Sequence, residues 1–363
     1  MTTRASSSGR LPFASRIGFG TSGIGTMNQP VSEREAEDLL GRAYAAGIRN
    51  FDTAPLYGYG LSELRLGRFL RQQERRTFTV STKVGRILVP PRGEPIDRGI
   101  WAAPLELKPV FDYTYAGTLR ALEQSANRLG FSDIDLVHIH DVDRYTHGEG
   151  YERMFEQAMD GCYRALDDLR AAGHIRAIGL GVNESATAAR FVRAGRFDVV
   201  MIAGRYTLLD NDALDELLPE AARRGTAVVA AAIFNSGILA AERTASTAAT
   251  YNYRPAPGAV TERVARLAEI CAKQGVPVGA AALQFPLRNP AIAAVILGMT
   301  EPQQVETNVA WANASIPDAL WDELRAAGLI RADAPTGPLT SSPFADSGSR
   351  PAEDADSTRE EPP

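Results

Sequence analysis

The feature that most constrains the fold is a strand-helix alternation that runs through most of the chain. Short apolar segments recur eight times, and each is followed by a helical pattern or by a loop and then a helical pattern. Such an alternation is typical of parallel strands joined by helices that cover the sheet. The predicted strands are 16–20, 48–52, 78–83, 134–140, 175–181, 198–203, 227–233 and 292–297.

Eight strand-helix units in a chain of 363 residues predict an α/β fold, the (β/α)8 or TIM barrel. We place this single barrel domain at residues 15–330. A long insertion, 86–115, follows the third strand and is rich in Pro, Gly and aromatic residues. Residues 332–363 are rich in Pro, Ser and acidic residues with few apolar ones, so we predict a disordered acidic tail.

Two helices have clear ends in the sequence. Ser32 and Glu35 form an S-x-x-E capping box, and Gly47 follows the last apolar turn of that helix. The segment 151–172 has a helical pattern and ends at Gly173 in the same way.

Composition excludes several classes of function. The formal net charge is −5, and six acidic against two basic residues in 335–363 account for most of it, so the barrel carries no basic surface for nucleic acid. No apolar run approaches the ~18 residues of a membrane span, and the N-terminus lacks the apolar core of a secretory signal. Cys162 and Cys271 are too few for a disulfide framework and have no metal-ligand spacing. We expect a cytoplasmic monomer or small homo-oligomer with no metal site, no membrane contact and a small-molecule substrate.

A dinucleotide-binding loop is the main rival interpretation. Gly18, Gly20 and Gly23 satisfy G-x-G-x-x-G, but a Rossmann loop opens a helix directly and has an acidic residue about 20 positions later. Here the helix begins only near Ser32, and Asp52 comes later than that spacing. We therefore interpret these glycines as a closely packed first strand and loop.

Titratable side chains fall at the ends of three neighbouring predicted strands. Asp52 ends the second strand, Tyr57 follows it, Lys83 ends the third and His140 ends the fourth. Alone, Asp52 could cap a helix, Tyr57 could pack on the surface, Lys83 could extend to solvent, and His140 could be a core histidine. In a barrel, however, catalytic groups lie at the C-terminal ends of the strands. Together these residues therefore predict an active site.

The four residue types could also act together in acid-base catalysis. A tyrosine phenol has a pKa near 10, so it needs help to exchange a proton at neutral pH. Lys83 beside Tyr57 would lower the pKa of the phenol, and Asp52 would keep the lysine charged. His140 could then hydrogen-bond and orient a substrate oxygen.

The motifs around these residues, "NFDTAPLYG", "VSTKVG" and "DLVHIHD", make the chain similar to the aldo-keto reductases. The resemblance covers about residues 15–328 and implies that Asp52, Tyr57, Lys83 and His140 are the catalytic tetrad. It further implies that the tyrosine gives or takes the proton while hydride passes to or from nicotinamide C4. NAD(P) would bind in extended form, without a Rossmann domain.

The resemblance also implies cofactor contacts after the later strands. "IGLGVNE" puts Asn183 at the nicotinamide carboxamide, with Val182 where the family usually has serine. Many relatives stack a tyrosine on the nicotinamide from the seventh strand, which is absent here, so Tyr206, Phe234 or neither covers that face. The other implied cofactor contacts are Arg205, Asn235, Ser236, Gly237, Leu239, Gly298, Met299, Thr300, Gln304 and Asn308.

"APLYGYGLSE", "GLGVNE" and "GRYTLLD" most resemble the D-threo-aldose 1-dehydrogenase branch, which includes L-fucose and D-arabinose dehydrogenases. This implies oxidation of the C1 hydroxyl of an aldose to a lactone. Trp101, Tyr113 and Asp141 are the predicted substrate contacts, and the insertion would form part of a lid, although its aromatic residues could equally be loop packing. Reduction of an aldehyde or ketone, oxidation of pyridoxal and a non-catalytic cofactor-binding role remain alternatives.

The predicted cofactor is NAD rather than NADP. The 2′-phosphate of NADP is normally met by Arg or Lys. The implied adenosine segment, 298–308, has no basic residue and contains Glu301 and Glu306. A cation from elsewhere, such as Arg205 or Arg288, would reverse this expectation.

Overall fold

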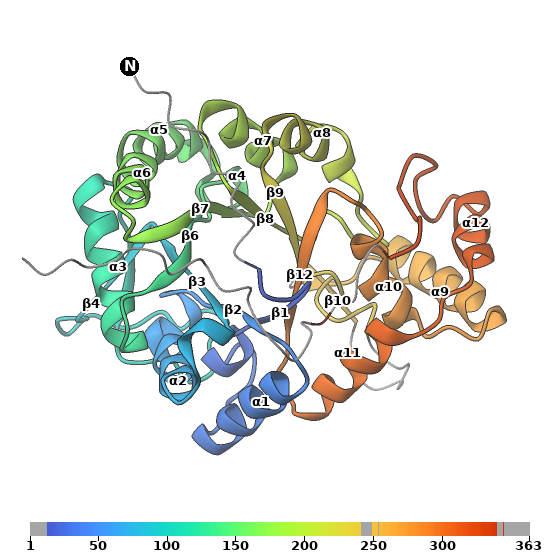
Figure 1. Cartoon of the computed structure of the whole chain (residues 1–363), viewed down its shortest axis with the longest axis horizontal. Helices are drawn as coiled ribbons and strands as arrows, with labels where there is room; N and C mark the ends of the chain where they lie inside the picture. Colours follow the sequence, from blue (N-terminus) through green and yellow to red (C-terminus); the bar gives the residue numbers. More distant parts are fainter. Residues whose placement is uncertain (1–12, 241–248, 253, 340–343, 345–363) are drawn as a thin grey trace, which may run out of the picture.

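The computed structural model describes residues 13–240, 249–252, 254–339 and 344. Eight parallel strands close into a barrel in the order β1-β12-β9-β8-β7-β6-β3-β2 (Figure 1). The strands are β1 (Ile17–Gly20), β2 (Asn50–Asp52), β3 (Thr79–Val84), β6 (Ile134–His140), β7 (Ile175–Val182), β8 (Val199–Ala203), β9 (Ala227–Ala231) and β12 (Ile292–Gly298). The predicted (β/α)8 barrel is confirmed, with strand ends within a few residues of those expected.

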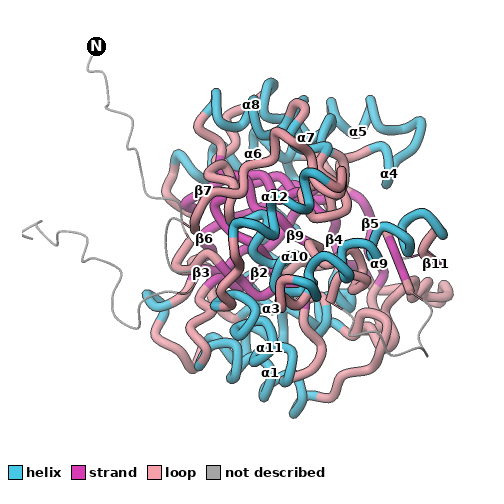
Figure 2. Tube along the Cα trace, turned by 90° about the vertical axis from the view of Figure 1, so that its right-hand side faces the viewer, coloured by secondary structure: helices cyan, strands magenta, loops and turns pink. Residues whose placement is uncertain are grey.

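Helices surround the barrel, so the strands lie at the centre of the molecule (Figure 2). The helices are α1 (Glu33–Ala45), α2 (Leu61–Leu70), α3 (Tyr115–Leu129), α4 (Arg144–His147), α5 (Tyr151–Gln157), α6 (Arg164–Ala171), α7 (Ser185–Ala194), α8 (Leu217–Arg224), α9 (Gly258–Lys273), α10 (Val278–Leu287), α11 (Gln303–Asn313) and α12 (Asp318–Ala326). Their apolar faces and the outer faces of the strands form one continuous core.

The predicted helix ends agree with the structure. Ser32 is the N-cap of α1, and its side chain and that of Glu35 form the reciprocal capping box. The segment predicted as one helix at 151–172 comprises α5, a π-helical turn (Ala158–Tyr163) and α6. Within this turn the Cys162 N–H donates to the Tyr113 carbonyl at 3.1 Å. The helix is thereby anchored to the end of the insertion.

The glycines of the first strand are explained by close packing. A Cβ on Gly18 would lie 2.4 Å from Cδ1 of Ile296, and one on Gly23 would lie 2.2 Å from the Met299 carbonyl oxygen. Both distances are far below van der Waals contact, and at Gly23 the neighbour is backbone, so only glycine fits there. The closely packed strand is confirmed in place of the Rossmann loop.

The insertion after β3 contains an antiparallel pair of strands, after which the chain continues into α3. Its strands are β4 (Arg86–Val89) and β5 (Lys108–Phe111). The segment between them crosses back to the first barrel loop, where Trp101 forms an antiparallel bridge with Met27. The insertion therefore lies beside the C-terminal ends of the first barrel strands, where the active site was predicted. A separate small hairpin, β10 (Thr250–Tyr251) and β11 (Arg254–Pro255), lies between β9 and α9.

The beginning of the predicted disordered tail is packed on the barrel, which corrects that boundary. Ala334 and Thr336 are buried, and Arg288 donates to the Gly337 carbonyl at 3.0 Å. Fixed polar partners and burial therefore extend beyond residue 332. The rest of the predicted tail, 340–343 and 345–363, lies outside the described residues.

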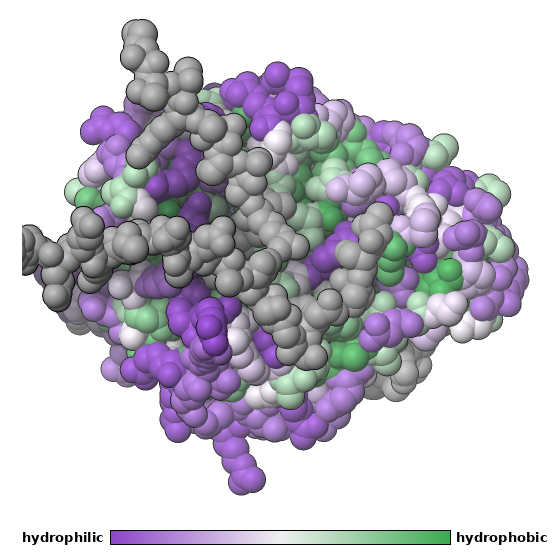
Figure 3. Space-filling view, in the orientation of Figure 1, coloured by the Kyte–Doolittle hydropathy of each residue, from purple (hydrophilic) through white to green (hydrophobic). Residues whose placement is uncertain are grey.

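The outer edge of the molecule is mostly hydrophilic in the view of Figure 3. This is the expected pattern for amphipathic helices that bury one face against strands. No helix among the described residues is long and apolar enough to cross a membrane. Both cysteines are buried and form no disulfide.

Candidate active site

A buried ion pair lies at the C-terminal ends of β2 and β3. The Lys83 Nζ is 2.5 Å from Oδ2 of Asp52 and 2.8 Å from the Thr53 carbonyl oxygen. Ser81 donates to the other carboxylate oxygen at 2.7 Å. Burial acts to lower the pKa of Lys83, but Asp52 and Tyr57 outweigh it and raise the pKa above its usual value. Lys83 is therefore positively charged at neutral pH.

Tyr57 is placed over this cation by the turn that follows β2. Lys83 Nζ lies 4.7 Å from the centre of the Tyr57 ring. The next residue, Gly58, has φ +61°, and a Cβ there would be 2.4 Å from the Gly25 carbonyl oxygen. The glycine-rich sequence is thus required for the chain to turn at the tyrosine.

The pKa of Tyr57 differs from the expectation from sequence. Burial raises it to about 12, and the opposing attraction of Lys83 does not compensate. The expected direction of the lysine's effect is present, but the expected net lowering is wrong for the structure as described. Tyr57 is a neutral phenol at neutral pH.

His140 completes the group at the end of β6. Its ring lies edge-on to Tyr57, with ring centres 6.1 Å apart. Burial, and then the charges of Lys83 and Arg86 and the neighbouring His138, hold the pKa of His140 well below its usual value. The barrel therefore brings the four predicted catalytic residues together, with the imidazole uncharged.

Two charged residues, Arg86 and Asp141, lie next to His140. Their pairing was not predicted from the sequence. Arg86, the first residue of β4, has Nη2 at 2.9 Å from Oδ2 of Asp141, and both side chains are mostly buried. Arg86 Nη1 lies 3.5 Å from the His140 Nδ1, and Oδ1 of Asp141 lies 3.5 Å from Nε2. Asp141 was predicted as a substrate contact, whereas Arg86 was missed because it reads simply as the start of the insertion.

The other predicted substrate contacts have different positions. Trp101 is buried with its ring centre 5.8 Å from that of Tyr57, so the insertion reaches the predicted catalytic tyrosine. Tyr113 is fully buried, and its hydroxyl donates to the His140 carbonyl at 2.9 Å. Tyr113 thus supports the end of β6 and has no exposed part to offer a substrate, which argues against its predicted contact.

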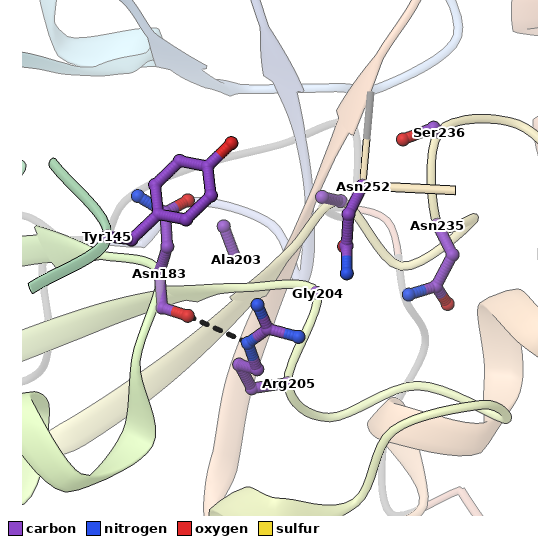
Figure 4. A pocket seen from close by; sticks show the side chains of 9 residues that line it. Tyr145, Asn183, Ala203, Gly204, Arg205, Asn235, Ser236 and Asn252 are labelled. Atoms are coloured by element: carbon purple, nitrogen blue, oxygen red, sulfur yellow. Dashed lines mark hydrogen bonds between the residues drawn. The ribbon is translucent and has the colours of Figure 1, made fainter. Parts of the chain in front are cut away.

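A polar pocket lies beyond the ends of β7, β8 and β9 (Figure 4). Figure 4 shows Tyr145, Asn183 and Arg205 on one side and Asn235 and Ser236 on the other. Arg205 Nε donates to the Asn183 carbonyl at 2.7 Å, which holds the guanidinium at the pocket. The lining residues are Tyr145, Asn183, Ala203, Gly204, Arg205, Ala232, Asn235, Ser236 and Asn252.

A protein-family model described as "Aldo/keto reductase family" matches residues 16–328, most of the chain. The chain belongs to this family. It is 42% identical to a pyridoxal 4-dehydrogenase of Microbacterium luteolum, over 86% of this chain and 94% of the relative. It is 39% identical to a D-threo-aldose 1-dehydrogenase of a Pseudomonas species, with the same coverage of the two chains. Among solved structures, the aldo-keto reductase AKR11C1 of Bacillus halodurans (holo form) superposes with a TM-score of 0.68 at 23% identity, covering 88% of this chain and 93% of its own.

Membership in the aldo-keto reductases makes the chain an oxidoreductase that uses a nicotinamide cofactor. The pocket suits that group, because the buried side-chain oxygen Oδ1 of Asn235 has no hydrogen-bond partner among the described residues and Arg205 supplies positive charge. Four of its non-glycine residues also have positive φ, namely Ala232, Asn235, Ser236 and Asn252. Strained backbone of this kind is commonly found at ligand sites.

The structure places the predicted cofactor residues in different environments. Asn183, Arg205, Asn235 and Ser236 line the pocket, and Gly237 and Gly298 are exposed. The side chains of Tyr206, Leu239, Met299 and Asn308 are buried. Tyr206 stacks on Phe285 and accepts a hydrogen bond from Asn289, so its ring is not free to cover a nicotinamide. Tyr145 and Asn252 line the pocket but were not predicted, because neither lies in a motif that the resemblance singled out.

The segment 298–308, predicted to contact adenosine, has its own hydrogen bonds and ion pair. The Gln304 Oε1 accepts from the Thr300 N–H at 2.7 Å and from the Glu301 N–H at 3.3 Å, near the start of α11. Glu306 pairs with Arg42 of α1 at 2.7 Å, a cation that the sequence argument did not consider. Arg288, which it did consider, is buried and donates to the Gly337 carbonyl. No cluster of three or more metal-ligating side chains occurs among the residues that the structure describes.

Proposed function

We propose that the protein oxidises the C1 hydroxyl of a cyclic aldose to a lactone with NAD⁺. One observation carries the proposal: a tyrosine over a buried lysine–aspartate pair, facing a neutral histidine, lies at the barrel end. The likeness to a D-threo-aldose 1-dehydrogenase supports the choice of substrate class.

The proposed chemistry assigns one role to each residue. The C1 hydroxyl proton passes to the Tyr57 phenolate, while the C1 hydrogen leaves with its electron pair. The nicotinamide, when bound, supplies the hydride acceptor. The Lys83 charge, fixed by Asp52, favours the phenolate over the phenol, and His140 holds the C1 oxygen by a hydrogen bond. The carbon–oxygen bond becomes a carbonyl, and the ring oxygen already attached to C1 makes the product a lactone.

NAD is the proposed cofactor. The adenosine segment 298–308 contributes no cation, and Arg42 is already paired with Glu306 and Asp38. A 2′-phosphate would therefore meet carboxylates and an engaged guanidinium, whereas a ribose hydroxyl needs no cation.

Pyridoxal is a second candidate substrate, favoured by the 42% identity to a pyridoxal 4-dehydrogenase. Pyridoxal carries an aldehyde next to a hydroxymethyl group and can close to a cyclic hemiacetal. In that form it presents a hydroxyl on a carbon bonded to a ring oxygen, as an aldose does. Both candidates thus belong to one chemical class, and the same proton and hydride transfers apply to each.

Reduction of an aldehyde or ketone is the main alternative reaction. Because burial raises the pKa of Tyr57 to about 12, the phenol is the form present at neutral pH, and the phenol is the proton donor of the reductive direction. A non-catalytic role as a cofactor-binding regulatory subunit is the alternative of another class, and the assembled catalytic group argues against it.

Absorbance measurements on the purified protein test the proposal. NADH production is followed with NAD⁺ and a panel of aldoses and pyridoxal, and NADH consumption with aldehydes and ketones. Aldose-dependent NADH production supports the proposal, whereas turnover confined to carbonyl reduction contradicts it. Rapid-mixing measurement of a single hydride transfer distinguishes a slow enzyme from a non-catalytic barrel.

A further inference from the structure

The most informative feature outside the four catalytic residues is the ion pair that encloses His140. We propose that Arg86 and Asp141 are positioning residues that hold the proton of the neutral His140 on Nε2, leaving Nδ1 as an acceptor. The inference builds on the proposed role of His140 as the group that hydrogen-bonds the substrate oxygen.

The argument starts from the donor properties of the two partners. A guanidinium has N–H donors and no acceptor, and an ionised carboxylate has acceptors only. Arg86 Nη1 lies 3.5 Å from the His140 Nδ1, so that nitrogen faces a donor. Asp141 Oδ1 lies 3.5 Å from Nε2, close enough for its negative charge to favour a hydrogen on that nitrogen. A hydrogen on Nδ1 would oppose both partners, whereas a hydrogen on Nε2 agrees with both.

The two partners also hold each other in place. Arg86 and Asp141 are joined at 2.9 Å, with side chains only 9% and 17% exposed, so solvent screens them poorly. The Arg86 guanidinium lies 4.2 Å from the centre of the Phe111 ring in β5. This contact from the far strand of the insertion limits the positions that the arginine can adopt.

Asp141 is held by its backbone as well. Its φ is +54°, an unusual value outside glycine that Asp tolerates better than most residues, and its N–H donates to the Gly181 carbonyl at 2.9 Å. Asn183 of the pocket also donates to its carboxylate at 3.4 Å. The carboxylate thus connects His140 to the side chain expected at the nicotinamide carboxamide.

The cations around His140 favour an uncharged ring. Lys83 and Arg86 are cationic, and burial together with these charges and His138 lowers the pKa of His140 far below its ordinary value. Asp141, at 3.5 Å from Nε2, is a negative charge that would favour a charged ring, but it is paired with Arg86. His140 is therefore a fixed single-proton donor, which leaves Tyr57 as the group that exchanges a proton with substrate.

The tautomer can be measured without any substrate. The chain has four histidines, so nuclear magnetic resonance of ¹⁵N-histidine-labelled protein is tractable, and the His140 signals are those absent from His140→Gln. The nitrogen that carries hydrogen and the one that carries a lone pair have widely separated ¹⁵N shifts. We expect wild-type protein to show one tautomer with the hydrogen on Nε2.

The variants are Arg86→Met, Asp141→Asn and the double variant. The double variant removes both charges and leaves no buried charge unpaired. We expect a mixture of tautomers in each, with kcat reduced about tenfold or more and KM also changed, since the donor to substrate is no longer fixed. The exposed Arg98→Met in the same insertion is the control and should match wild type.

Two outcomes overturn the inference: wild-type hydrogen on Nδ1, or a double variant that keeps the single Nε2 tautomer. A kcat loss in Arg98→Met equal to that of Arg86→Met also overturns it. Failure to oxidise any aldose would instead contradict the proposed function, and a tautomer change in the variants would still support the inference.

Discussion

Substitutions in the buried pair of Lys83 and Asp52 test whether its charges contribute to stability, to turnover or to both. Their side chains are 2% and 3% exposed, and the Nζ to Oδ2 distance is 2.5 Å. Lys83→Met removes the cation and leaves the Asp52 carboxylate buried with one hydroxyl donor, Ser81. Breaking such a pair from one side typically costs about 3–5 kcal/mol of the free energy of unfolding.

The double variant Asp52→Asn/Lys83→Met separates stability from chemistry. Because both charges are gone, no uncompensated carboxylate remains, and replacing a buried ion pair by neutral groups is often close to neutral in stability. We expect the double variant to recover most of the stability lost by Lys83→Met. Both variants should lose turnover, since neither keeps a cation beside the Tyr57 phenol.

Urea unfolding followed by circular dichroism measures these differences. The control is Lys108→Met, which breaks an exposed pair with Glu94 on the insertion and should change stability by about 0.5 kcal/mol or less. A loss in Lys83→Met no larger than in the control would refute the argument. A double variant as unstable as Lys83→Met would refute it too.

Four further predictions follow from the site and the tail. Tyr57→Phe should keep cofactor binding, measured by fluorescence titration, and lose about 10²–10⁴ in kcat, so near wild-type turnover would exclude its role. The pKa of Tyr57 is raised to about 12 and oxidation requires the phenolate, so the oxidation rate should rise with pH above neutrality. Reduction uses the phenol, so the reduction rate should fall only at high pH. An oxidation rate that stays flat from neutral to alkaline pH would contradict this. The ratio of kcat/KM values should favour NAD over NADP, and a ratio favouring NADP would imply that a cation, such as Arg42 released from Glu306, binds the 2′-phosphate. Deleting 345–363 should leave the urea midpoint unchanged, because that segment has few apolar residues. Deleting 334–363 should lower the urea midpoint, because Ala334 is buried and Arg288 loses its carbonyl partner at Gly337. Equal midpoints for the two deletions would show that these contacts contribute nothing.

Local patterns in the chain are sufficient to predict the barrel. Each strand and helix has its own apolar period and end signals, such as the Ser32 and Glu35 capping box, and eight repeats of one unit have few ways to close. The positions of Asp52, Lys83 and His140 follow as well, because parallel strands end at the same side of a barrel. These features depend on sequence neighbours or on a topology that repetition dictates.

The properties that depend on distant contacts were decided by the tertiary structure alone. The pKa of Tyr57 follows from how many groups exclude water around it, and no spacing in the sequence reports that burial. The partnership of Arg86 with Asp141 joins residues from two different loops, and the burial of Tyr113 depends on the end of β6. Motifs identify which residue types are present, but three-dimensional packing sets their charge and their partners, because both depend on surroundings that are far away along the chain.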